Sequence, residues 1–446
     1  MKGKFMKKLI RSLCLTLTVI LLASALFGCA KTPDTAETET GTGTETETES
    51  GTDAPQENAA LTVNGASIKD YTVIYSRKAN SGGEKAFEYL NQRLEELYGA
   101  VLPGDTKEQD GRYEIVIARD GGDGAMAEAY EEHPSGIIGA SGKKIIMMGV
   151  NYSVLCQLID IFLAKATGDG AQKSISLTEL ETPNITSDAL KVMSYNVLTD
   201  LGKEGRPADA RERMIETILE NGIDVLGTQE DGAENSEVFL AGMKDYSAYG
   251  GAAITGNGNY IYWKTDKFNL IKKGYYFLSD TPTVKSKYED STSYRTMAYV
   301  ILEFKDTGRQ FLFVCTHLDY RASEATRIKQ INVLDSLIKK VNANGLPVVL
   351  LGDFNTLWTK SNGAINAFTL GNPEMVMTWK VAEAKGDTGE TLVSQEDFAT
   401  RYLGAYDYIF VGAERIYTKY YTVVANIKDG KYPSDHLPIV AELELY

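Results

Sequence analysis

The sequence predicts an α+β domain of two packed β-sheets flanked by helices, preceded by a smaller α/β domain. From residue 190 onward, many short apolar runs rich in β-prone residues occur beside only two strong helical patterns. Over residues 61–185, apolar runs alternate with amphipathic helical patterns, which is typical of βαβ packing. The 446-residue chain is long enough for both domains.

The first 29 residues are predicted to be an export signal. Five basic residues lie within residues 1–11, and an apolar stretch follows over residues 13–27. The ending Leu26-Phe27-Gly28-Cys29 resembles a bacterial lipobox, although Phe27 is bulkier than usual there. That resemblance implies that Cys29 is lipidated and anchors the protein at the bacterial cell surface without spanning the bilayer. The alternative is an uncleaved membrane anchor, for which the apolar run is short.

Residues 30–60 are predicted to form a disordered acidic tether. Residues 31–60 hold eight acidic residues and one lysine, with very few apolar residues to bury. The formal charge of −15 divides into +5 for the leader, −7 for the tether and −13 for the remainder. An acidic folded part disfavours tight duplex nucleic-acid binding, which requires a basic surface.

Residues 61–185 are predicted to form the small α/β domain. The expected strands cover residues 71–76, 113–118 and 143–150, and the expected helices end at Gly99 and Gly168. The pattern resembles the small α/β domain in front of the catalytic domain of several glycoside hydrolases, without any shared motif residue. We find no catalytic group here, and His133, in an acidic loop, is expected at the surface.

Residues 190–446 are predicted to form the two-sheet domain, after a linker at 180–188. One helix is expected over 208–222 and another over 323–345, with Ser323 as its N-cap. The expected strands cover residues 190–198, 224–229, 260–265, 296–304, 310–318, 347–353, 406–411 and 438–445.

Four polar clusters border apolar runs in this domain. They are Gln229-Glu230, Thr316-His317, the segment 352–355 and the segment 434–436, and they contain two of the three histidines. Polar side chains at the ends of several strands can converge on one rim of a sheet. Carboxylates, amides and imidazoles gathered there would suit metal-assisted hydrolysis.

These clusters belong to a series of motifs that resembles the endonuclease/exonuclease/phosphatase superfamily, which has the pancreatic DNase I-like two-sheet fold. The motifs occur in the family's order over 190–446: SYNVL, GTQE, FLSDTP, YRTMAY, THLD, GDFN, YDYIF and SDHLPIVAEL. The resemblance implies a metal-dependent phosphoester hydrolase, either a phosphodiesterase or a phosphatase.

Glu230 is the expected metal ligand. Its hard carboxylate suits Mg²⁺ or Mn²⁺, and the sequence has no Cys/His cluster with zinc spacing. The resemblance makes Glu230 the principal ligand and places Asn196 near the metal. Asp435 is expected at the metal or the nucleophile. The alternative for Glu230 is a solvent-facing strand end.

His436 is the expected general base, because an imidazole near neutrality can accept a proton from water. It needs a partner to hold the correct tautomer, and the resemblance assigns that role to Asp407. Asp435 would point away from His436 if the segment were extended. The alternative for His436 is a structural histidine that caps a loop.

Asp353 and Asn355 are two residues apart, so on an extended segment both would face one cavity. Asp353 would polarise the attacking water or the leaving group, and Asn355 would orient the phosphoryl group through hydrogen bonds. The alternative is a plain turn in which Asn355 accepts a positive φ.

Three further residues are expected to contact the phosphoryl group. The resemblance makes His317 the second histidine, which stabilises charge in the transition state. Arg295 could provide a bidentate phosphate contact, with a strand-surface arginine as the alternative. Asn259 is a weaker candidate of the same kind.

We therefore expect in-line attack on phosphorus by a water that His436 and Asp407 activate, in a monomeric protein that meets the membrane only through its lipid. The substrate stays open among nucleic acids, phospholipid headgroups, inositol phosphates and phosphorylated glycans, and the number of metal ions is not fixed by the sequence. The competing hypothesis is a non-catalytic surface binding module for a phosphorylated or glycan ligand on the same fold.

Overall fold

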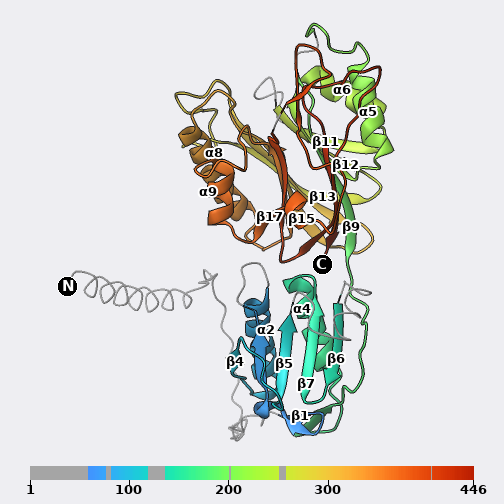
Figure 1. Ribbon diagram of the computed structural model, residues 1–446, viewed down its shortest axis with the longest axis vertical. Coiled ribbons are helices and arrows are strands. Elements are labelled where there is room, and N and C mark those ends of the chain that lie inside the picture. The colour runs from blue at the N-terminus through green and yellow to red at the C-terminus, as the bar shows by residue number, and fades with distance from the viewer. Residues whose placement is uncertain (1–58, 77–81, 119–135, 200–201, 251–257, 403) are drawn as a thin grey trace, which may run out of the picture. The chain divides into compact units, whose positions relative to one another are not determined.

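A computed structural model describes residues 59–446 apart from residues 77–81, 119–135, 200–201, 251–257 and 403 (Figure 1). The predicted leader, most of the tether, Cys29 and His133 lie outside the described residues. Within the part of the chain that is described, no helix is both long and apolar enough to cross a bilayer.

A five-stranded sheet forms the centre of residues 72–164, in the order β4-β3-β5-β7-β6. Strands β3, β5 and β7 are parallel, as the βαβ pattern predicted. The strands are β3 (Thr72–Tyr75), β4 (Gly104–Asp105), β5 (Glu114–Ala118), β6 (Gly136–Ser141) and β7 (Lys144–Gly149). A second, three-stranded sheet consists of β1 (Ala60–Val63), β2 (Ala66–Ser67) and β8 (Gln172–Ile175). The short 3₁₀ helix η1 (Ile68–Asp70) follows β2.

Helices α2 (Gly83–Tyr98) and α4 (Tyr152–Ala164) pack in the same hydrophobic core as these strands. Gly99 ends α2 in the left-handed conformation, as predicted. The prediction that the second helix continues to Gly168 was wrong. The backbone N–H of Lys165 bonds to Phe162, and Thr167 pairs with Ser174, so the chain has already left the helix.

The rest of the described chain forms two large sheets. The seven-stranded sheet has the order β11-β12-β10-β9-β23-β22-β18, and the six-stranded sheet β13-β14-β15-β16-β21-β17. The strands of the first are β9 (Asp188–Asn196), β10 (Val225–Asp231), β11 (Tyr246–Gly250), β12 (Gly258–Lys264), β18 (Ala384–Lys385), β22 (Ile416–Val423) and β23 (Ile439–Leu445). Those of the second are β13 (Phe268–Phe277), β14 (Thr296–Phe304), β15 (Gln310–His317), β16 (Val348–Asp353), β17 (Met375–Met377) and β21 (Asp407–Gly412).

Helices cover the outer face of each large sheet. One apolar cluster joins the seven-stranded sheet to α5 (Ala210–Glu220) and α6 (Ala233–Gly242). Another joins the six-stranded sheet to α8 (Glu324–Val341) and α9 (Ala364–Gly371), and the single-turn α10 (Thr378–Val381) follows β17. This arrangement confirms the predicted α+β fold of two sheets flanked by helices.

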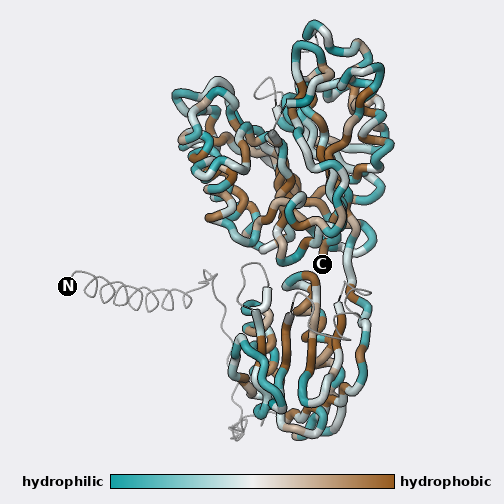
Figure 2. Tube along the Cα trace, in the orientation of Figure 1, coloured by the Kyte–Doolittle hydropathy of each residue, from teal (hydrophilic) through white to brown (hydrophobic). Residues whose placement is uncertain are grey.

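A third cluster fills the space between the two sheets, with residues such as Val225, Phe313 and Ile439 from both inner faces. Figure 2 shows the central strands as mostly hydrophobic and many connecting loops as hydrophilic. Gly227 allows close packing here, because a Cβ at this position would overlap Leu351 of the facing sheet.

The strand directions bring the polar clusters to one edge of this sandwich. Strands β9 and β10 are parallel, as are β15 and β16, so their carboxyl ends meet. Strand β21 is antiparallel to β16 with Asp407 opposite Asp353, and β23 is antiparallel to β9. The same edge therefore receives side chains from six strands or strand ends: Asn196, Glu230, His317, Asp353, Asp407 and His436.

Candidate active site

A histidine–carboxylate pair lies at the centre of this edge. Nδ1 of His436, just before β23, is 2.8 Å from Oδ2 of Asp407, the first residue of β21. Both side chains are buried. Burial alone would lower the pKa of His436, but Asp407 and Asp353 outweigh it and raise that pKa well above its ordinary value. The pair has the geometry of a base held in one tautomer by its carboxylate.

Asp353 is a third member of this group. Its Oδ2 lies 3.7 Å from Nε2 of His436, and the ligand atoms of Asp353, Asp407 and His436 all lie within 4.8 Å of one another. Burial and the neighbouring Asp407 carboxylate raise the pKa of Asp353 to about 7, although His436 opposes the shift. Because Nδ1 of His436 is already bonded to Asp407, we interpret the trio as a proton-transfer group.

Asn196 links this group to Glu230. Its Nδ2 lies 3.1 Å from Oδ2 of Asp353 and 3.4 Å from Oε1 of Glu230. The sequence placed Glu230 at the end of a strand, but β10 continues to Asp231 with a register shift between Thr228 and Asp231. Glu230 has a φ of 56°, in the left-handed region, and this conformation changes the direction of the backbone at the register shift.

The collected groups fit a hard divalent cation. The Asn196 NH₂ group lies between the carboxylates of Glu230 and Asp353, and Asp407 lies beside Asp353, so the oxygen donors here are carboxylates. Among the described residues, Oδ1 of Asp407 is buried and has no hydrogen-bond partner, which leaves an acceptor to be satisfied. Asp435 is held differently, since its carboxylate accepts hydrogen bonds from Gln395 and Ser434. Its role at the metal stays a prediction.

The GDFN segment is a turn. Asn355 has a φ of 48°, and its backbone N–H donates to Oδ1 of Asp353 at 2.9 Å. The expectation of an extended segment was therefore wrong, but the turn itself brings the Asn355 amide within 3.0 Å of Nε2 of His317. Gly352 has a φ of 152° and lies against the Thr316 carbonyl, where a Cβ would overlap.

His317 occupies the end of β15, with Nε2 at 3.4 Å from Oδ2 of Asp353. Burial lowers the pKa of His317 well below its ordinary value, and the nearby charges of Arg295 and His436 lower it further. His317 is therefore neutral near pH 7, unlike His436.

Arg295 lies largely buried just before β14. Burial lowers its pKa, while the charges of Asp319, Asp353 and Glu230 oppose that shift. Nε is 3.7 Å from Asp319 Oδ2, and within the described part of the chain this buried Nε has no hydrogen-bond partner. Arg295 thus faces the carboxylate cluster, which favours the phosphate-contact prediction over an ordinary surface arginine.

Asn259 is buried at the start of β12, and its Nδ2 donates to the Thr296 carbonyl at 2.9 Å. This bond fixes the backbone beside Arg295. Its direct contact with substrate stays a prediction.

Asp319 is a residue to which the sequence analysis gave no role. It is fully buried, accepts hydrogen bonds from the backbone of Ser293, Arg321 and Ala322, and pairs with Arg295. It thereby fastens the loop before β14 to the loop after β15. Its place two residues after His317 in the THLD motif was the signal that could have indicated it.

Arg206 is a second residue that the sequence did not single out. Its guanidinium donates to the carbonyls of Val197, Leu198 and Pro433 at 2.8–2.9 Å. It ties the segment after β9 to the loop that carries His436. Nothing in the Gly- and Lys-containing segment around it pointed to this role.

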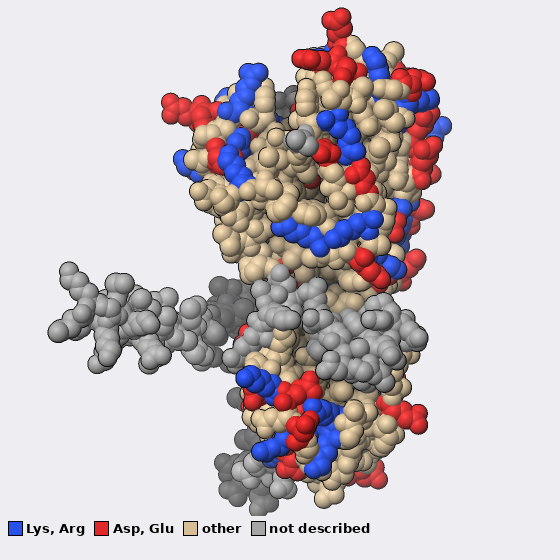
Figure 3. All heavy atoms as spheres, viewed as in Figure 1, with Lys and Arg blue, Asp and Glu red and all other residues tan. Residues whose placement is uncertain are grey.

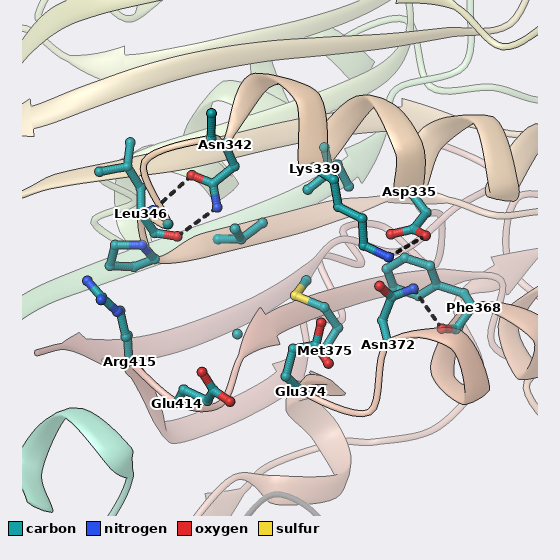
Figure 4. Close-up of a pocket in the computed structure, with 16 residues that line it drawn as sticks. Asp335, Lys339, Asn342, Leu346, Phe368, Asn372, Glu374, Met375, Glu414 and Arg415 are labelled. Atoms are coloured by element: carbon teal, nitrogen blue, oxygen red, sulfur yellow. Dashed lines mark hydrogen bonds and ion pairs between the residues drawn. The ribbon is translucent and has the colours of Figure 1, made fainter. Parts of the chain in front are cut away.

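The cavity in Figure 4, of about 390 Å³, lies at the opposite end of β16, around Val348. Its lining comes from α8, the end of α9 and the turn at Glu414 and Arg415, and it includes the Asp335–Lys339 ion pair. None of the predicted site residues lines it. This cavity is therefore separate from the candidate active site.

The model of the Endonuclease/Exonuclease/phosphatase family matches residues 193–436, which is more than half of the chain. The chain belongs to this family. The match begins in β9 and ends at His436, so it includes all the groups at the site edge. A search of curated proteins found no match.

Solved structures of the family resemble this part of the chain. An endonuclease/exonuclease/phosphatase family protein from Bacteroides thetaiotaomicron is 24% identical with a TM-score of 0.51, over 59% of this chain and 100% of that one. A similar family protein from Bacteroides vulgatus is 23% identical with a TM-score of 0.52, over 58% and 100%. A mannosyl-6-phosphatase from Bacteroides thetaiotaomicron is 25% identical with a TM-score of 0.50, over 57% and 99%.

Proposed function

We propose that this protein is a Mg²⁺-dependent phosphoester hydrolase that acts at the bacterial cell surface. Members of the Endonuclease/Exonuclease/phosphatase family hydrolyse phosphoesters. The observation that carries the proposal is the His436–Asp407 pair at 2.8 Å, which Asp353 and Asn196 connect to Glu230.

His436 acts as the base in the proposed reaction. Asp407 holds the proton on Nδ1, so Nε2 is free to accept one from a water that attacks phosphorus in line with the leaving group. The carboxylates that raise the pKa of His436 make its neutral form a stronger proton acceptor, and a bound cation would favour that neutral form by offsetting their charge. No covalent enzyme intermediate is required.

The charge that develops on phosphorus is met by other groups at this edge. Arg295 supplies positive charge beside the carboxylates, and the neutral imidazole of His317 and the amide of Asn355 lie close enough together to contact one phosphoryl group. Mg²⁺ or Mn²⁺ held by Glu230, with Asn196 and Asp435 nearby, would neutralise the phosphoryl oxygens and the leaving group.

Hydrolysis assays with and without metal test the proposal. Protein lacking residues 1–60 should hydrolyse p-nitrophenyl phosphate, bis-p-nitrophenyl phosphate or both with Mg²⁺, and EDTA should abolish the reaction. Loss of all turnover on both esters and on a wider phosphoester panel would favour the competing hypothesis of a non-catalytic binding module. The similarity to a mannosyl-6-phosphatase supports including phosphomonoesters in that panel.

A Glu230→Gln variant tests the metal assignment. The amide keeps the size of the side chain but loses the negative charge that binds a hard cation. We expect half-maximal activity to need at least about tenfold more Mg²⁺. An Mg²⁺ titration identical to that of the wild type would contradict the assignment.

The surface location rests on the sequence of the first 29 residues. If Cys29 carries the lipid, the wild type expressed in a bacterium supplied with radiolabelled palmitate should become labelled, whereas a Cys29→Ser variant should not. Equal labelling of the variant would contradict the lipid anchor.

A further inference from the structure

Four large aromatic side chains are exposed among the described residues. Tyr294, Tyr320, Trp358 and Tyr402 keep 37, 53, 39 and 45% of their surface accessible. All other tyrosine, phenylalanine and tryptophan side chains in the described ranges are buried or half-buried. Single exposed aromatic side chains are common, so the informative question is whether these four lie together.

All four lie beyond the same edge of the six-stranded sheet. Tyr294 is two residues before β14, and Tyr320 is three residues after β15. Trp358 is five residues after β16, and Tyr402 is five residues before β21. This is the edge that carries Arg295, His317, Asp353 and Asp407. We call the four side chains the aromatic rim.

Two members of the rim flank Arg295. Tyr294 precedes it in the chain, and Tyr320 follows Asp319, whose carboxylate lies 3.7 Å from Nε of Arg295. Lys285 lies 4.8 Å from the Tyr294 ring, and Arg321 lies 5.0 Å from the Tyr320 ring. These cations hold the two rings in place over one face each.

The other two members lie on loops tied to the strands near the base. The backbone N–H of Trp358 donates to the Tyr408 hydroxyl, and the Trp358 ring packs against Trp379 at 5.2 Å between centroids. Tyr402 pairs with Leu392, which also forms a β-bridge with His436. The rim therefore lies on the loops that border the edge with the phosphate-binding groups.

The charged residues of the loops around the rim indicate which class of ring-bearing ligand the rim could bind. The loops 278–295, 318–323, 354–363 and 382–406 carry nine acidic and seven basic residues. Figure 3 likewise shows the two signs interspersed on the face that it displays. A nucleic acid, whose bases also stack, would bring many phosphates and require a basic surface that these loops lack.

We propose that the aromatic rim binds the sugar ring of a phosphorylated carbohydrate while the site hydrolyses its phosphoester. A pyranose ring is uncharged, and the C–H groups on its face pack against the electron-rich face of an aromatic ring. The proposal rests on the phosphoester hydrolase function and names its substrate class. It covers a free sugar phosphate and a phosphorylated sugar at the end of a glycan.

Kinetics on matched esters test this inference. Wild-type protein lacking residues 1–60 is assayed with glycerol 2-phosphate, which has no ring, with a hexose 6-phosphate, with its methyl glycoside and with adenosine 5′-monophosphate. We expect kcat/KM for the sugar esters to exceed that for glycerol 2-phosphate by at least about tenfold, the value of one or two aromatic contacts. A preference for the methyl glycoside over the free sugar indicates a glycan end.

The variants Tyr320→Ala, Trp358→Ala and Tyr402→Ala should each lower kcat/KM for the sugar ester by about three- to tenfold. Activity on glycerol 2-phosphate should stay within about twofold of the wild type. Leu370→Ala, which removes a side chain with 76% exposure at the far end of α9, is the matched control and should change neither rate.

Equal rates on ring-bearing and ring-free esters, a preference for the nucleotide, or sugar rates unaffected by every rim variant would each overturn the inference. If no ester is hydrolysed, the hydrolase function fails instead. Calorimetric titration of the wild type with hexose 6-phosphate and glycerol 2-phosphate then tests sugar binding by the rim independently of hydrolysis. Tighter sugar binding that Trp358→Ala and Tyr402→Ala abolish supports the rim, and equal binding refutes it.

Discussion

His317 and His436 are both buried at one sheet edge, yet their neighbours drive their pKa values in opposite directions. Both rings lie within 4 Å of Asp353, but His436 also bonds to Asp407, whereas His317 faces the amide of Asn355 and the positive charge of Arg295. One imidazole is therefore suited to exchange protons and the other to serve as a neutral polar contact.

Nuclear magnetic resonance of the imidazole nitrogens can test this difference directly, because the chain has only three histidines. In metal-free protein near pH 7, His436 should be charged and His317 neutral, since their pKa values lie well above and well below the ordinary value. His317 should remain neutral as the pH is lowered to 6. Titration of both rings near pH 6.5 would contradict the described electrostatics.

Asp319 is expected to position Arg295 without contacting substrate. An Asp319→Asn variant loses the charge that faces the guanidinium, so Arg295 should be less well fixed. We expect KM to rise by about fivefold to tenfold with a smaller change in kcat. The control is Asp335→Asn, which removes a carboxylate from an ion pair on α8 far from the site. An unchanged KM in the Asp319 variant would argue for a purely structural role.

Much of the candidate site could be predicted because its residues are few, polar and placed at the ends of apolar runs. His436, Asp407, Asp353, Asn196 and Glu230 come together as expected. Spacing left Asn355 open between an extended segment and a turn with positive φ, and the turn was the alternative that proved correct, because the Asn355 backbone N–H bonds to Asp353. Asp319 was missed since its role arises only when two distant loops meet.

At the scale of elements, Glu324 fastens the start of α8 to the site turn and to α9. Its carboxylate accepts hydrogen bonds from Thr356 and from the backbone of Ala364, and it pairs with Arg327 and Lys360. Partial burial opposes ionisation, but these partners outweigh it and lower the pKa of Glu324 to about 2. The ionised form therefore stabilises the junction of two helices with the GDFN turn.

A Glu324→Gln variant should be less stable at pH 7 by about 1–2 kcal/mol, because charged hydrogen bonds become neutral ones. Since the folded-state pKa is depressed, the stabilisation is fully present above pH 4.5 and is lost as the pH falls toward 2. Urea unfolding should thus show a smaller difference between wild type and variant at pH 3 than at pH 7. An equal difference at both values would contradict the assigned pKa.

Most of the long strands were predicted because their apolar runs are continuous, and β14 matches its predicted bounds. The edge strand β13 was missed because residues 269–273 are all exposed and do not alternate between apolar and polar side chains. Helix α6 was missed because its buried residues, Asn235, Ser236 and Phe239, include only one large apolar side chain. Elements that bury little apolar surface leave little periodicity to detect.

At the scale of the whole molecule, two sheets hold the site by meeting at one edge. Asn196 and Glu230 come from the seven-stranded sheet, whereas His317, Asp353 and Asp407 come from the six-stranded one. The tightly packed core between the sheets, where Gly227 admits Leu351, fixes the spacing of these groups. We expect function to depend on this packing as much as on the polar residues themselves.

The most direct test of this account compares wild type and His436→Ala in Mg²⁺-dependent hydrolysis, with His133→Ala as the matched histidine control. Removing the base should lower kcat by about 100- to 10,000-fold, while the thermal unfolding curve shows that the fold persists. His133→Ala should behave as the wild type. A folded His436→Ala variant with undiminished activity would contradict the claim that this edge is the catalytic centre.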